Sequence, residues 1–249
     1  MHENGFMDSH RELAGATYSA MRWNTPLSEA HAAVLIERLN ASAAASVVDL
    51  GCGWAELLMR VLESAHADCV GTGVDSDSAL LERAAASVAR RGLQQRINLV
   101  ERPAQEWAEP ADRVICIGAS HALGGTAPAL RALSTLVTPG GRLLFGDACW
   151  VSEPTTEALA IFGQDVVRLA EVIEHALGAG WRVLSLTTAD QREWDDFESS
   201  WRLGREQWLL TNPTAPSAPE VRQQLDGRLR EYVTEYRGVL AFCYLVLTR

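Results

Sequence analysis

The stretch at residues 47–55 constrains the fold more than any other part of the chain. It reads VVDLGCGWA, so an apolar run leads into an acidic residue and two glycines, Gly51 and Gly53, before a helical pattern begins. Glycine permits a tight turn and a close approach of a ligand to the backbone, and the next helix offers unpaired N–H groups. A second apolar run ends at Asp75, where an open α/β sheet places the carboxylate that binds a ribose diol. Together these strand ends predict a cradle for a nucleotide-containing cofactor.

At these residues the chain resembles the class I S-adenosylmethionine-dependent methyltransferases. VVDLGCGWA (47–55) is similar to the family's first motif, and GVDSDSALLERA (73–84) to its acidic second strand and the helix that follows. DRVICIG (112–118) is similar to the fourth strand, and LVTPGGRLLF (136–145) to the turn into the fifth. The resemblance implies S-adenosylmethionine as methyl donor and S-adenosylhomocysteine as product. The residues expected to bind this cofactor are Asp49, Gly51, Gly53, Asp75, Ser76, Ala104, Gln105 and Gly118, with Gln105 at a position where the family more often has an acid.

Other classes of protein also contain a glycine turn after a buried strand. A dinucleotide dehydrogenase requires a small residue at a third position, where this chain has Leu57 or Leu58, depending on the register. Asp49 suits the cationic amino-acid end of S-adenosylmethionine and would repel a pyrophosphate. Two alternatives stay open: a noncatalytic module that binds the cofactor, and a related non-methyl transferase. An aminopropyl transferase would need acids after the fourth strand, and GASH (118–121) has none.

The order of strand-like and helix-like segments predicts the fold class. The chain has 249 residues, 47% of them hydrophobic, which suffices for one large α/β domain with additions. The segments alternate, so we expect a doubly wound, mostly parallel, seven-stranded sheet with helices on both faces, including helices at 26–39, 76–91 and 165–178 and strands at 181–186 and 239–247. The single methyltransferase domain is expected to comprise an N-terminal helical cover (1–40), a cofactor-binding core (45–189 and 238–249) and a helical lid (190–237).

Charge and composition limit the classes of binding partner that we expect. The net charge is −10 and the 22 Lys and Arg positions form no basic stripe, so we expect a small-molecule acceptor and no nucleic acid. No apolar run is long enough to span a membrane and no signal peptide precedes the core, which predicts a cytoplasmic protein without membrane association. The five scattered cysteines indicate reduced thiols, and no metal-ligand set is visible. A role in natural-product or secondary metabolism is compatible with this, and a homodimer is left open.

The predicted lid carries an aromatic face. Trp194, Phe197, Trp201 and Trp208 are spaced by 3, 4 and 7 residues, so their rings fall along one side of a helix. This face either packs on the sheet or contributes a ring to an acceptor pocket, for which Trp201 is the candidate. A second, polar helix at 220–236 is expected at the surface.

Catalysis is predicted at the carboxyl edge of the sheet. His121 follows the fourth strand, and an imidazole can accept a proton near neutral pH, so it is either the general base or a structural histidine. Trp150 and Trp23 are further candidates for binding the acceptor, while Asp147 is expected to cap the end of the fifth strand. Tyr18, Arg22 and Trp23 belong to a segment that family members fold over the cofactor, where Arg22 would pair with the methionine carboxylate. Whether oxygen, nitrogen or carbon is methylated is not readable from the sequence.

Overall fold

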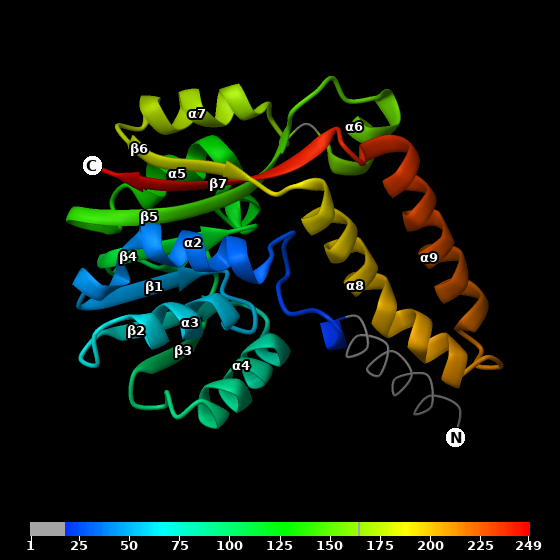
Figure 1. Cartoon of the computed structure of the whole chain (residues 1–249), viewed down its shortest axis with the longest axis horizontal. Helices are drawn as coiled ribbons and strands as arrows, with labels where there is room; N and C mark the ends of the chain where they lie inside the picture. Colours follow the sequence, from blue (N-terminus) through cyan, green and yellow to red (C-terminus); the bar gives the residue numbers. More distant parts are fainter. Residues whose placement is uncertain (1–17, 164) are drawn as a thin grey trace.

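The computed structural model describes residues 18–163 and 165–249, which form one seven-stranded sheet (Figure 1). The strand order is β3-β2-β1-β4-β5-β7-β6. Strands β1 to β5 pair in parallel, whereas β7 is antiparallel to both of its neighbours, β5 and β6. This topology confirms the predicted doubly wound, mostly parallel sheet. The strands are β1 (Ser46–Leu50), β2 (Val70–Asp75), β3 (Ile97–Glu101), β4 (Ala111–Ile117), β5 (Val137–Trp150), β6 (Arg182–Thr188) and β7 (Leu240–Thr248).

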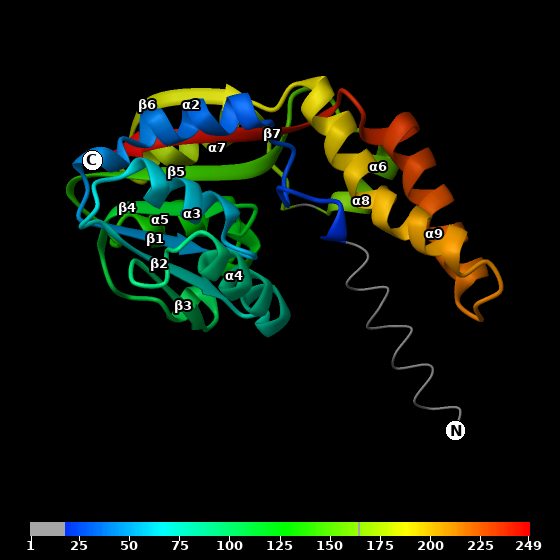
Figure 2. The same ribbon diagram turned by 60° about the horizontal axis from the view of Figure 1, so that its bottom comes forward.

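Helices cover both faces of the sheet (Figure 2). The first hydrophobic core contains buried residues of α2 (Glu29–Leu39), α3 (Glu56–Ser64) and α4 (Ser78–Arg90), and the second contains those of α5 (Thr126–Leu133) and α7 (Leu169–Gly178). Because α/β sheets bury apolar side chains on both sides, the two cores lie on opposite faces of the same strands. No helix of the described residues is long and apolar enough to cross a lipid bilayer.

Capping side chains explain where the helices begin. The predicted helix at 26–39 starts at Glu29, because the hydroxyl of Ser28 accepts a hydrogen bond from the His31 N–H at 3.2 Å. Likewise, the carboxylate of Asp77 accepts from Ala79 N and Leu80 N, so the helix predicted at 76–91 begins at Ser78. Both helices therefore lie slightly inside the ranges that periodicity indicated.

Two local expectations are wrong. Strand and helix do not alternate throughout, since only a single 3₁₀ turn (Ala104–Glu106) lies between β3 and β4. Asp147 also does not cap a strand end: β5 continues to Trp150, and Asp147 pairs with Cys243 of β7. The antiparallel pairing with β7 extends β5 beyond the point where its apolar pattern loosens.

A pair of helices, α8 (Gln191–Thr211) and α9 (Ala218–Glu231), is inserted between β6 and β7 and projects beyond the sheet (Figure 1). We call this pair the helical hairpin. It has a small core of its own, made of Trp208, Leu209, Ala218, Val221 and Leu225. The segment 220–236 is thus only partly at the surface, and its last residues form a π-helical turn (Tyr232–Tyr236) whose two tyrosines are buried. A helix that packs on a neighbour must bury one face, even when most of its residues are polar.

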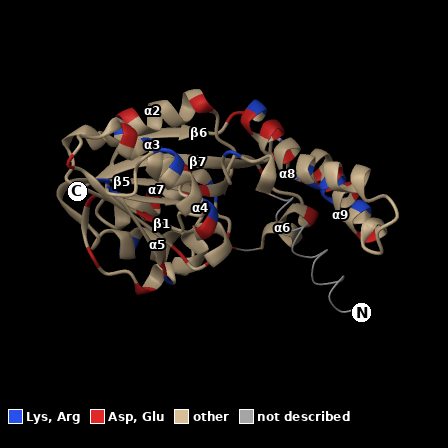
Figure 3. Ribbon diagram, turned by 90° about the horizontal axis from the view of Figure 1, so that it is seen from below, with Lys and Arg blue, Asp and Glu red and all other residues tan. Residues whose placement is uncertain are grey.

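Figure 3 shows acidic and basic residues interspersed along the ribbon of the helical hairpin and along the helices of the core. Residues 1–17 of the predicted N-terminal cover lie outside the described residues.

Candidate active site

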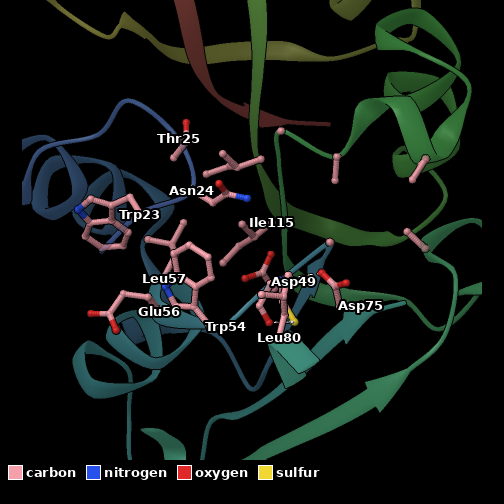
Figure 4. A pocket seen from close by; sticks show the side chains of 18 of the residues that line it. Trp23, Asn24, Thr25, Asp49, Trp54, Glu56, Leu57, Asp75, Leu80 and Ile115 are labelled. Carbon is pink, nitrogen blue, oxygen red and sulfur yellow. Dashed lines mark hydrogen bonds between the residues drawn. The ribbon is translucent and has the colours of Figure 1, made fainter. Parts of the chain in front are cut away.

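A cavity of about 240 Å³ opens at the carboxyl ends of β1, β2 and β4 (Figure 4). Its walls come from the turn after β1, the end of β2, the segment after β4 and an N-terminal stretch whose lining residues lie between 22 and 27. We call the segment 22–28 the N-terminal wall. Parallel strands present their carboxyl ends at one edge, which is where open α/β sheets bind ligands. Residues far apart in the sequence therefore meet in one place.

The turn after β1 depends on small residues. Gly51 has φ 74° and Gly53 has φ 53°, and a Cβ atom at Gly51 would come within 2.4 Å of the Ala119 Cβ. Gly51 is thus required both for its left-handed conformation and for the approach of the segment after β4. Ala55, which precedes α3, is also left-handed, with φ 57°. The N–H groups of Gly51 and Cys52 donate to Val74 O at 2.8 and 3.0 Å, so the turn is fixed against β2.

Asp75 joins this turn to the start of α4. Its Oδ2 accepts from Gly53 N at 2.7 Å and its Oδ1 accepts from Asp77 N at 2.9 Å. Each carboxylate oxygen can accept a further hydrogen bond. Since Asp75 also lines the cavity, these free lone pairs are available to a ligand with two adjacent hydroxyl groups.

Asp49 lies at the end of β1 with 4% of its surface exposed. Burial, followed by the nearby charge of Asp75, raises its pKa to about 8. A buried carboxyl group with a raised pKa favours binding of a cation. A positive charge beside Asp49 would offset both the desolvation of its carboxylate and the repulsion between Asp49 and Asp75. The cavity therefore has an end that suits an ammonium group.

The N-terminal wall is fastened to the cavity by Trp54, the residue between Gly53 and Ala55. The indole N–H of Trp54 donates to Arg22 O at 2.9 Å, and the guanidinium of Arg83 stacks over its ring at 4.1 Å. Arg83 also donates to Tyr18 O at 2.8 Å and to Met21 O at 3.0 Å. The sequence pattern did not single out Trp54, although its place inside the turn motif was a signal that could have done so.

Arg22 and Trp23 both line the cavity, as do Asn24 and Thr25, which the sequence pattern did not indicate. The Nη1 of Arg22 donates to Glu29 at 3.0 Å, so in this structure its charge is paired within the protein. The pairing of Arg22 with a methionine carboxylate stays a prediction.

His121 also lines the cavity. It lies in the short 3₁₀ helix Ser120–Leu123 that follows β4, and its side chain is exposed. Asp147, on β5, is close enough to interact electrostatically with His121 and accepts a hydrogen bond from Thr126 Oγ1 at 2.7 Å; burial raises the pKa of Asp147. An imidazole at the rim of the cavity can contact both a bound ligand and solvent.

Most of the predicted residues converge on this cavity, and three do not. Gln105 is exposed on the turn whose neighbouring residue, Ala104, lines the cavity. Trp150 is 4% exposed and packs edge-on against Phe162, with ring centres 5.8 Å apart. Trp201 lies in the helical hairpin, where the guanidinium groups of two arginines contact its ring. The predicted residues that line the cavity are Trp23, Asp49, Gly51, Gly53, Asp75, Ser76, Ala104, Gly118 and His121.

These features fit S-adenosylmethionine. Asp75 matches a ribose diol, the buried carboxyl of Asp49 matches an ammonium group, and the space at Gly51 admits no side chain. A dinucleotide would bring a pyrophosphate against two carboxyl groups, which is unfavourable.

Comparison with known proteins agrees with this fit. Residues 48–143 match a family model described as a methyltransferase domain. The uncharacterised protein YjhP of Escherichia coli K12 is 30% identical over 226 residues, which cover 88% of this chain and 90% of YjhP.

Two solved structures are similar over nearly their whole length. Both are described as S-adenosylmethionine-dependent methyltransferases in complex with S-adenosylhomocysteine. The one from Thiobacillus denitrificans is 31% identical, with a TM-score of 0.84, and the alignment covers 95% of this chain and 97% of that one. The one from Geobacter sulfurreducens is 27% identical, with a TM-score of 0.85 and the same coverage. The chain belongs to the class I S-adenosylmethionine-dependent methyltransferases, and its cofactor is S-adenosylmethionine.

Proposed function

We propose that this enzyme methylates a small-molecule acceptor bound in the cavity between His121 and the N-terminal wall. The observation that carries the proposal is that the cofactor-type residues of β1 and β2 and the imidazole of His121 line one and the same cavity. The net charge of −10 supports an acceptor other than nucleic acid, because phosphate backbones require a basic surface.

In this proposal each residue at the strand ends has a defined part. Asp75, assisted by Ser76, binds the ribose hydroxyls, and Asp49 faces the amino group of the methionine moiety. Gly51, Gly53 and Gly118 leave room for the cofactor to approach the backbone, and Ala104 lies where the adenine ring is expected. When bound, S-adenosylmethionine supplies a methyl group on a positively charged sulfur.

The rest of the cavity orients the acceptor. Ile115, Ile117 and Leu57 give it an apolar floor, which excludes water, while Asn24 offers a primary amide for hydrogen bonding. Holding the reacting atom in line supplies much of the acceleration of a displacement reaction. His121 takes the proton of the acceptor if its nucleophilic atom arrives protonated. In this proposal, the helical hairpin acts as a lid that does not itself line the cavity.

The first test concerns Asp75. Asp75→Asn should weaken the binding of S-adenosylhomocysteine about tenfold or more, because a hydrogen bond to a charged group contributes about 1.5–3 kcal/mol. The asparagine keeps the shape of the side chain and one acceptor oxygen for the turn. Asp68→Asn is the matched control, since Asp68 precedes the same strand with its side chain 93% exposed. Calorimetric titration gives both affinities, and tighter binding of NAD than of S-adenosylhomocysteine would contradict the proposal.

The second test concerns His121. His121→Ala should lower the rate of methyl transfer about a hundredfold, the range expected for loss of a general base, while S-adenosylhomocysteine binds as before. The rate is measured with isotope-labelled S-adenosylmethionine and a small-molecule extract, in which mass spectrometry identifies the labelled acceptor. A rate loss that stays small at every pH would assign the histidine a structural role, leaving positioning as the source of the acceleration.

A further inference from the structure

The N-terminal wall is held from outside the cavity by a tyrosine of β7. Tyr244 is fully buried, and its hydroxyl donates to Pro26 O at 2.8 Å. With that proton engaged, the same oxygen accepts a hydrogen bond from Thr25 Oγ1 at 3.0 Å. Thr25 itself lines the cavity. One phenol group thus fixes two consecutive residues of the wall.

A carboxylate of the helical hairpin holds the other end of the wall. Glu193, in the first turn of α8, is 7% exposed and accepts from Ser28 N at 2.8 Å. The Nδ1 of His31 lies 3.1 Å from each of its carboxylate oxygens. Burial acts to raise the pKa of Glu193, but the hydrogen bonds from His31 and Ser28 outweigh it and lower that pKa to about 2. The carboxylate is therefore ionised and fully engaged at neutral pH.

His31 connects these two anchors. Its Nε2 lies 2.7 Å from Thr187 Oγ1 on β6, and its ring meets the ring of Tyr244 edge-on, with centres 5.0 Å apart. The imidazole thus contacts three elements, namely α8, β6 and β7, which lie next to the start of the helical hairpin. Movement of α8 relative to the sheet would strain the same contacts that set the wall.

We propose that Tyr244 and Glu193 are positioning residues that hold the N-terminal wall in the conformation in which Asn24 faces the acceptor. The term acceptor rests on the proposed function, whereas the positioning of the wall does not. Figure 4 shows Asn24 next to Thr25, on the side of the cavity away from Asp75. A wall fixed before binding loses less conformational entropy when the acceptor binds, which lowers the concentration of acceptor needed.

Hydrogen exchange in the ligand-free protein tests the positioning directly. Tyr244→Phe and Glu193→Gln should each speed exchange of the amides at 22–28, Pro26 excepted, about tenfold. The first change removes both hydrogen bonds that join the phenol to Thr25 and Pro26, and the second leaves one acceptor oxygen for two donors, Ser28 N and His31 Nδ1. Both changes leave the packing nearly unchanged. Tyr236→Phe is the matched control, because its buried hydroxyl donates instead to Glu198 of α8, at 3.1 Å. Exchange at 22–28 that is unchanged in both variants, or that rises equally in the control, would overturn the proposal.

Kinetics separate positioning from a general loss of structure. With a dilution series of the extract fraction that accepts the label, both variants should raise the apparent KM for acceptor about fivefold. The KM for S-adenosylmethionine should rise less, because the hydrogen bonds that the variants change are made by Thr25, Pro26 and Ser28 and not by Arg22. Equal increases in both KM values would overturn the proposal.

A double variant supplies a second check. Thr25→Val combined with Tyr244→Phe should speed amide exchange at 22–28 no more than the stronger single change does, because both changes remove the same hydrogen bond. Additive effects would overturn the proposal. Transfer of the label from S-adenosylmethionine to a small molecule by the wild type checks the proposed function separately, so failure of that transfer would leave the result of the exchange experiment intact.

Discussion

At the scale of single residues, the ends of β1 and β2 bring two carboxyl groups, Asp49 and Asp75, to one cavity. Gly51, Gly53 and Asp75 meet at the cavity because parallel strands end at one edge, which the order of the motifs already indicates. Gln105 and Ala104 show the limit of this reasoning. They are neighbours in one tight turn, and only the backbone conformation decides that Ala104 faces the cavity while Gln105 faces solvent.

The protonation of Asp49 gives a prediction at this scale. In the folded protein burial, followed by the charge of Asp75, raises its pKa to about 8, whereas an unfolded chain has a value of about 4. Between these values the native state holds a proton that the unfolded state has released, so this residue makes the free energy of unfolding fall as pH rises from about 4 to about 8.

Asp49→Asn removes the titration. In the absence of cofactor, the variant should therefore be more stable than the wild type at pH 8, with the difference shrinking toward pH 4. Urea unfolding at a series of pH values measures both curves. Parallel curves for the two proteins would show that Asp49 is already ionised in the native state.

At the scale of elements, helix α8 explains why an aromatic face predicted from periodicity did not identify its partner. The helix is 21 residues long, and its single face serves two separate cores. Near its start, Trp194 packs with Tyr236 in the core that adjoins the sheet, and near its end Trp208 belongs to the core of the helical hairpin. Periodicity shows which side of a helix is apolar, but the length over which one partner covers it depends on tertiary structure.

Trp201 packs against the core of the helical hairpin and gives a prediction for the stability of that hairpin. Its ring is contacted by the guanidinium groups of Arg205 and Arg228, at 4.5 and 3.9 Å from the ring centre. Trp201→Ala should lower the free energy of unfolding by about 1–3 kcal/mol, through lost burial and lost cation–π contacts, and leave the affinity for S-adenosylhomocysteine unchanged.

Leu210→Ala on the same helix is the control for this substitution, because Leu210 is 81% exposed. It should change neither quantity in unfolding and calorimetric experiments. If Trp201→Ala instead weakened acceptor binding at unchanged stability, Trp201 would belong to the acceptor site as first predicted.

At the scale of the whole molecule, the alternation of strand-like and helix-like segments predicted a doubly wound, mostly parallel sheet, although only a 3₁₀ turn lies between β3 and β4. The attachment of the N-terminal wall was not predictable. Thr25 and Tyr244 are 219 residues apart, and Ser28 and Glu193 are 165 apart. A single sequence shows which residues are apolar or can form hydrogen bonds, but it does not show which distant partner each one meets.

The position of β7 has a consequence for the synthesis of the enzyme. In the sheet β7 lies between β5 and β6, yet it follows the helical hairpin in the chain. While a ribosome is making the protein, β5 is an open edge and β6 has no strand to pair with, although every other strand is already present. Open edges of this kind recruit strands from neighbouring chains. The nascent enzyme is therefore most prone to aggregation in the short interval before its final strand inserts, and slow translation of residues 190–239 would lengthen that interval.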